Sequence, residues 1–76
     1  MVKVIIEKDG DHGYIHFEGK IPLESLPKIG EKIELFYPDG WVLKLRKVIY
    51  IRKVFGNEGD FYFKIIVEHK AYEFEE

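Results

Sequence analysis

The chain has 76 residues and a formal net charge of −2; because independent domains rarely have fewer than about 50 residues, residues 1–76 form one domain. The absence of cysteine excludes a disulfide framework, a thiolate zinc site and a cysteine nucleophile. The sequence has no apolar run of about 18 residues and no signal-peptide pattern, so we expect a cytoplasmic protein with no membrane partner.

The composition is rich in Lys, Glu and Ile and lacks Thr and Gln. This bias is typical of hyperthermophile proteins. An idealised design or an AT-rich genome gives the same composition, so a thermophilic source is one interpretation among three. None of the three bears on function.

The first part of the chain predicts a β-hairpin. Residues 2–8 alternate apolar and charged side chains, which is the period-2 pattern of a half-buried strand. Residues 9–13 have the sequence Asp-Gly-Asp-His-Gly, which favours a turn. Residues 14–18 resume the alternation, with Ile15 and Phe17 as the apolar pair.

Residues 19–30 predict a packed loop. The two prolines and two glycines of this segment oppose a helix longer than one turn. Its four apolar side chains indicate that it covers one end of the core, with a 3₁₀ turn at residues 24–26.

Residues 31–37, followed by Pro38, Asp39 and Gly40, predict a second hairpin. We expect a three-residue loop in which Gly40 takes positive φ and Tyr37 faces Trp41. In that register the opposed pairs are Leu35 with Leu43 and Ile33 with Leu45 on the buried face, and Phe36 with Val42 and Glu34 with Lys44 on the other.

Residues 41–55 contain no Gly, Pro or acidic residue and form a strand too long to stay straight. We expect a bulge or sharp bend near Arg46 and Lys47. Residues 56–60 then reverse the chain, residues 61–67 form the last strand, and the acidic tail at 72–76 adds a short sixth strand or frays. The expected core consists of Val4, Ile6, Trp41, Leu43, Leu45, Ile49, Ile51, Phe61, Phe63 and Ile65.

Five short strands joined by hairpins predict an all-β fold, a small five-stranded partly open barrel. Residues 26–33 (LPKIGEKI), the turn 38–41 (PDGW) and residues 48–50 (VIY) resemble the small uncharacterised SH3-like barrel proteins of bacteria and phages. The resemblance covers about residues 26–67. It implies an SH3-like fold and no particular activity or functional residue.

No catalytic pattern is found. The three histidines have no metal-ligand spacing to one another, and Ser25 lacks the glycine-flanked turn that exposes a nucleophile. We therefore expect no catalytic residue, no metal site and no cofactor, and interpret the chain as a non-enzymatic binding or accessory module.

The charges are segregated, because the long strand 41–55 carries five basic side chains and no acidic one. A candidate binding face collects Lys44, Arg46, Tyr50, Arg52, Tyr62 and Lys64. A solvated, aggregation-resistant surface explains these cations as well. The favoured function is interaction with a protein or peptide through exposed aromatic rings or a free strand edge. The alternative is single-stranded nucleic-acid binding through the basic, aromatic-bearing face of strand 41–55. The oligomeric state stays open.

Overall fold

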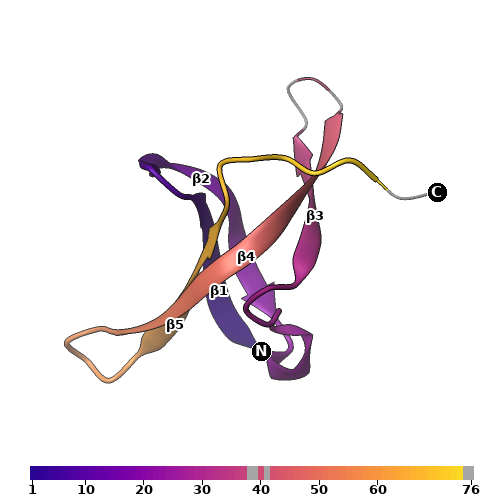
Figure 1. The fold of residues 1–76 in the computed structure, drawn as a ribbon. Helices are drawn as coiled ribbons and strands as arrows, with labels where there is room; N and C mark the ends of the chain where they lie inside the picture. Colours follow the sequence, from indigo (N-terminus) through magenta and orange to yellow (C-terminus); the bar gives the residue numbers. More distant parts are fainter. Residues whose placement is uncertain (38–39, 41, 75–76) are drawn as a thin grey trace.

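The computed structural model describes residues 1–37, 40 and 42–74, and its regular structure is almost entirely β (Figure 1). The alternating segments form strands because their apolar side chains gather on one face of a sheet. The elements are β1 (Val2–Lys8), β2 (Asp11–Ile21), the 3₁₀ turn η1 (Leu23–Ser25), β3 (Lys32–Tyr37), β4 (Val42–Phe55) and β5 (Phe61–Val67). This confirms the all-β class and its five strands.

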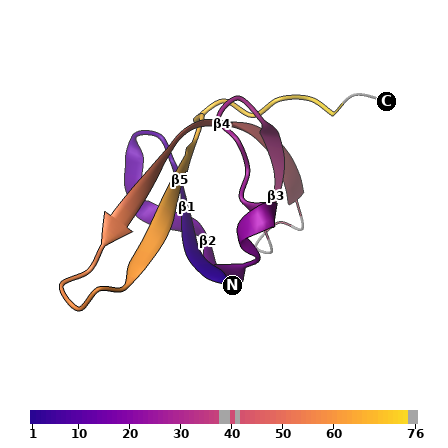
Figure 2. The same ribbon diagram turned by 90° about the horizontal axis from the view of Figure 1, so that it is seen from below.

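The five strands form one sheet in the order β2-β1-β5-β4-β3. The sheet curls through 244° into a half-barrel, so the predicted partly open barrel is confirmed. Figure 2 shows the sheet as an arc, with β3 at one end and β2 at the other. Neighbouring strands are antiparallel except β1 and β5, which are parallel. The prediction of consecutive hairpins did not include the parallel pairing of β1 with β5, because these two strands lie far apart in the chain.

The core lies on the concave face of the half-barrel. Its buried members are Val4, Ile6, Leu35, Val48, Ile65 and Val67. Val4, Ile6 and Ile65 confirm the prediction, and Ile51 and Phe63 pack against this cluster while staying partly exposed. Leu43 and Phe61, also predicted to be buried, are 44% and 38% exposed. Trp41 lies outside the described residues.

The register of the β3–β4 hairpin differs by one residue from the prediction. Tyr37 pairs with Val42 and Leu35 pairs with Lys44, so four residues, not three, connect the strands. A shift of one residue moves every side chain of one strand to the other face of the sheet. Leu43 therefore leaves the core face. The described glycines with positive φ are Gly10, Gly30 and Gly59, and Gly40 is not among them.

The long strand β4 bends at a bulge, as predicted, but the bulge lies at Ile49 instead of Arg46 and Lys47. Val48 pairs with Val67 and Tyr50 pairs with Ile66, so Ile49 is the extra residue. Because of this extra residue, the side chains of β4 before Ile49 point to the opposite faces from those that a regular strand would give them. Val48 thus faces the core and is 1% exposed.

The loop after β2 is only partly packed. β2 continues to Ile21, and the turn η1 begins one residue earlier than predicted. Leu26 packs against the core, whereas Leu23 and Ile29 are 58% and 65% exposed. The packing predicted for residues 19–30 is therefore confirmed for Ile21 and Leu26 and wrong for Leu23 and Ile29. The tail makes one isolated bridge, between Leu45 and Tyr72.

Candidate binding groove and basic pocket

The binding face predicted from the sequence is divided between the two faces of the sheet. Tyr50, Arg52, Tyr62 and Lys64 lie together on the convex face, where Arg52 pairs with Lys64 across β4 and β5. Lys44 and Arg46 line a pocket on the concave face instead. The bulge at Ile49 causes this division, because it reverses the side-chain alternation between the two halves of β4.

On the convex face, part of the predicted positive charge is already compensated. The ammonium group of Lys64 lies 3.2 Å from Oε1 of Glu7, which is 5% exposed. The ammonium group of Lys3 lies 5.8 Å from the centre of the Tyr62 ring and covers it. Arg52 and Tyr50 remain exposed. Of the six residues of the predicted binding face, Tyr50 and Arg52 are thus well placed to contact a ligand on the convex face.

The open side of the half-barrel contains an apolar groove with a volume of about 260 Å³, which we call the seam groove. It lies between β2 and β3, the two edge strands of the sheet. Its apolar lining consists of Val4, Ile6 and Ile65 from the core, Phe17 and Ile21 from β2, Pro27 from the following loop, and Ile33 and Leu35 from β3. The polar residues of the lining are Ser25, Glu31 and Glu34. Phe17 is 40% exposed. The seam groove is therefore the place where the core of this small domain meets solvent.

A bulge in β2 places a histidine at one end of this open side. Ile6 pairs with Phe17 and Glu7 pairs with Ile15, so His16 is the extra residue between them. As a result Ile15, predicted to share a face with Phe17, turns to the convex face and is 47% exposed. The His16 ring instead meets the Tyr37 ring edge-on, with the ring centres 5.2 Å apart.

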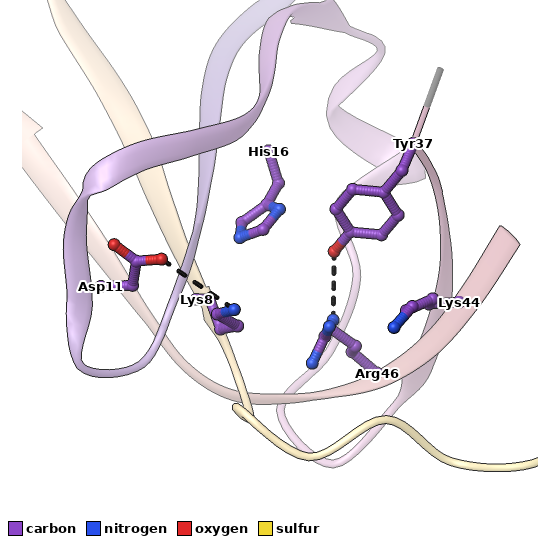
Figure 3. A pocket seen from close by; sticks show the side chains of 6 residues that line it. All are labelled: Lys8, Asp11, His16, Tyr37, Lys44 and Arg46. Carbon is purple, nitrogen blue, oxygen red and sulfur yellow. Dashed lines mark hydrogen bonds and ion pairs between the residues drawn. The ribbon is translucent and has the colours of Figure 1, made fainter. Parts of the chain in front are cut away.

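His16 borders a second cavity of about 270 Å³, which we call the basic pocket. Its lining consists of Lys8, Asp11, His16, Tyr37, Lys44 and Arg46. Figure 3 shows these side chains, contributed by β1, β2, β3 and β4, converging on one space. Among the described residues Asp11 is the only carboxylate of the lining, and its Oδ2 lies 3.9 Å from the ammonium group of Lys8. The described part of the lining thus contains three cations and one anion.

Arg46 is 5% exposed and is held by neutral acceptors. Its Nε donates a hydrogen bond of 3.1 Å to the Tyr37 hydroxyl, as drawn in Figure 3. Its Nη1 donates to the carbonyl oxygens of Glu68, at 3.4 Å, and of His69. These bonds link β4 to β3 and to the segment that follows β5. Among the described residues no carboxylate forms an ion pair with Arg46.

The pKa of His16 lies below its usual value of 6.5. The largest cause is burial, which disfavours the charged imidazolium. Lys8 and Arg46 lower the pKa further by repulsion, and Asp11 opposes them.

The sequence did not predict that His16, Lys8, Asp11 and Tyr37 lie together in one pocket. A bulge leaves no mark in the alternation of β2, and its position depends on the partner strand.

The β4–β5 hairpin extends away from the rest of the half-barrel (Figure 1). The aromatic residues Phe55 and Phe61 next to its turn are exposed. The ammonium group of Lys53 lies 4.5 Å from the centre of the Phe61 ring, and Phe55 is 67% exposed. In the part of the chain that the structure describes, no group of three or more His, Asp or Glu side chains could hold a metal ion.

Comparisons of the chain with protein families, with curated proteins and with solved structures find no match. No helix within the described residues is long and apolar enough to cross a membrane.

Proposed function

We propose that this protein is a non-enzymatic binding module that takes an extended segment of a partner protein into the seam groove. The observation that carries the proposal is the position of the groove, which exposes apolar core side chains between the two edge strands β2 and β3. An SH3-like relationship is part of the same proposal, supported by the five-stranded half-barrel.

An extended peptide fits such a site for two physical reasons. An edge strand offers backbone N–H and C=O groups on its outer side, and a peptide that adds as a further strand pairs with them. Alternate side chains of the added strand then point to one face, where Phe17, Ile33 and Leu35 line the groove. Backbone pairing supplies affinity, and the apolar groove selects the side chains.

The test uses two residues of β2 that are similarly exposed and lie on opposite faces. Peptides are first selected from a displayed random library against the whole protein, and their dissociation constants are measured by fluorescence anisotropy. In Phe17→Glu the new charge lies in the groove, so we expect at least a tenfold loss of affinity, about 1.4 kcal/mol. In Ile15→Glu the charge lies on the convex face, and we expect less than about a twofold change.

Thermal unfolding of both variants checks that the half-barrel persists. Backbone amide shifts in the NMR spectrum should move along β2 and β3 when a selected peptide binds. Equal losses in the two variants, or shifts confined to the β4–β5 hairpin, would show that the seam groove is not the site. A library that yields no peptide above background also counts against the proposal.

Single-stranded nucleic acid is a second candidate, favoured by one observation on the convex face. Arg52 and Tyr50 are both exposed there, so a cation that can contact a phosphate lies on the same face as an aromatic ring on which a base can stack. If phosphates bind there, Arg52→Ala should reduce the slope of log affinity against log salt by about 0.7, the value for one phosphate contact. Tyr50→Ala should cost about 1 to 3 kcal/mol through lost stacking and leave that slope unchanged. Lack of binding by a labelled mixed-sequence oligonucleotide at low salt would remove this candidate.

A further inference from the structure

The basic pocket lies beside the seam groove along both edge strands. His16 in the pocket adjoins Phe17 in the groove on β2, and Tyr37 lies two residues from Leu35 on β3. A strand that enters the groove therefore reaches the pocket within one or two residues, since each residue of an extended chain spans about 3.3 Å.

Among the residues that the structure describes, the lining of the basic pocket carries more positive than negative charge, because Lys8, Lys44 and Arg46 face the single carboxylate of Asp11. Arg46 is almost fully buried, and the three hydrogen bonds of its guanidinium go to a hydroxyl and two carbonyl oxygens. Lys44 also lines the pocket; its side chain is exposed and forms no ion pair with another described residue. Buried charges in proteins are normally paired with an opposite charge, because desolvation is otherwise uncompensated.

We propose that the basic pocket anchors a carboxylate of the peptide bound in the seam groove, so that the partner segment is acidic at one end. This inference rests on the proposed function. The carboxylate belongs either to an Asp or Glu side chain or to the C-terminus of the partner segment. In both cases it accepts hydrogen bonds from Arg46 and faces Lys44, which are charge-assisted contacts of the stronger kind.

The titratable groups around His16 make anion binding dependent on pH. Lys8 on β1 and Arg46 on β4 repel the imidazolium, and Asp11 on β2 attracts it. A bound carboxylate offsets the two cations, so it raises the pKa of His16. By linkage the carboxylate binds more tightly as pH falls through that pKa, until the carboxylate itself takes up a proton.

The first experiment uses the protein alone and sodium acetate as the probe, with sodium chloride at the same ionic strength as the control. Acetate should move the His16 ring and Arg46 Nε resonances in the NMR spectrum and raise the pKa of His16. In Lys44→Met the acetate dissociation constant should rise at least fivefold. In Lys53→Met, which removes a cation of the same strand outside the pocket, it should stay within twofold. Responses that chloride reproduces, or that Lys44→Met leaves unchanged, overturn the inference.

The second experiment uses the peptides selected for the seam groove. Each acidic side chain is changed to its amide, Asp to Asn or Glu to Gln, and separately the C-terminal carboxylate is amidated. One of these changes should weaken binding about tenfold or more, and which one does so identifies the source of the carboxylate. If the peptides bind in the groove and none of the amide changes weakens binding, the carboxylate contact is refuted. The proposed function is not affected by that result. Acetate binding at His16 without any groove-binding peptide refutes the proposed function instead.

Discussion

The variant Ile65→Ala is expected to lose about 2 to 5 kcal/mol of the free energy of unfolding, the usual cost of truncating a fully buried isoleucine. Ile65 is 0% exposed and lies between Ile6 on β1 and Ile51 on β4. Neither neighbouring strand can move in to fill the cavity, because both are tied to β5 by their backbone ladders. A domain of this length has a total stability of about 4 to 11 kcal/mol. Chemical denaturation followed by circular dichroism measures the loss.

Leu43→Ala is the matched control, because the observed register and the predicted one disagree about this residue. At 44% exposure Leu43 should contribute less than about 1 kcal/mol. In the predicted register it would lie opposite Leu35 in the core, and its truncation would cost as much as that of Ile65. A large loss in Leu43→Ala together with a small loss in Ile65→Ala would contradict the arrangement of β3, β4 and β5 described here.

The sequence predicts four of the five strands well, because each strand signal is local, whereas β2 extends beyond the predicted residues 14–18 at both ends. Residues 2–8, 31–37 and 61–67 match β1, β3 and β5 almost residue for residue. The parallel pairing of β1 with β5 has no local signal, since Val4 and Phe63 meet across most of the chain. Its cost in chain entropy is offset only when the complete core forms.

The faces of the strands were predicted less well, because three insertions of a single residue change them. The β3–β4 turn contains one more residue than its Pro-Asp-Gly pattern indicates, and bulges occur at His16 and Ile49. Each insertion moves the neighbouring side chains to the opposite face. Arg46 thereby joins the concave face with His16, and the two residues meet at the basic pocket.

The candidate site could therefore be predicted only in part. Tyr50, Arg52, Tyr62 and Lys64 share a face as expected, because the β4–β5 register between the bulge and the turn is regular. The seam groove and basic pocket follow from the curl of the sheet, which brings β2 and β3 toward each other. No local sequence pattern predicts the curl of the sheet.

Arg46→Met is expected to lower the free energy of unfolding by about 1.5 to 3 kcal/mol, the range for hydrogen bonds to a charged group. Methionine fills most of the space of the arginine stem, so the change removes mainly the bonds to Tyr37, Glu68 and His69. A well-packed apolar residue can replace a buried ion pair at little cost. Arg46 differs because its acceptors are neutral oxygens that methionine leaves without a donor.

The loss should be concentrated in the segment after β5, because two of the three bonds hold its backbone. The Tyr72 amide, which donates a hydrogen bond of 2.7 Å to the Leu45 carbonyl, should exchange with deuterium faster in Arg46→Met than in the unchanged protein. Tyr37→Phe is the control: it removes one acceptor of Arg46 and no backbone contact, so we expect a loss of about 1 kcal/mol and little change at Tyr72. If Tyr72 exchanges at the same rate in Arg46→Met as in the unchanged protein, Arg46 does not hold this segment, and its role is confined to the pocket.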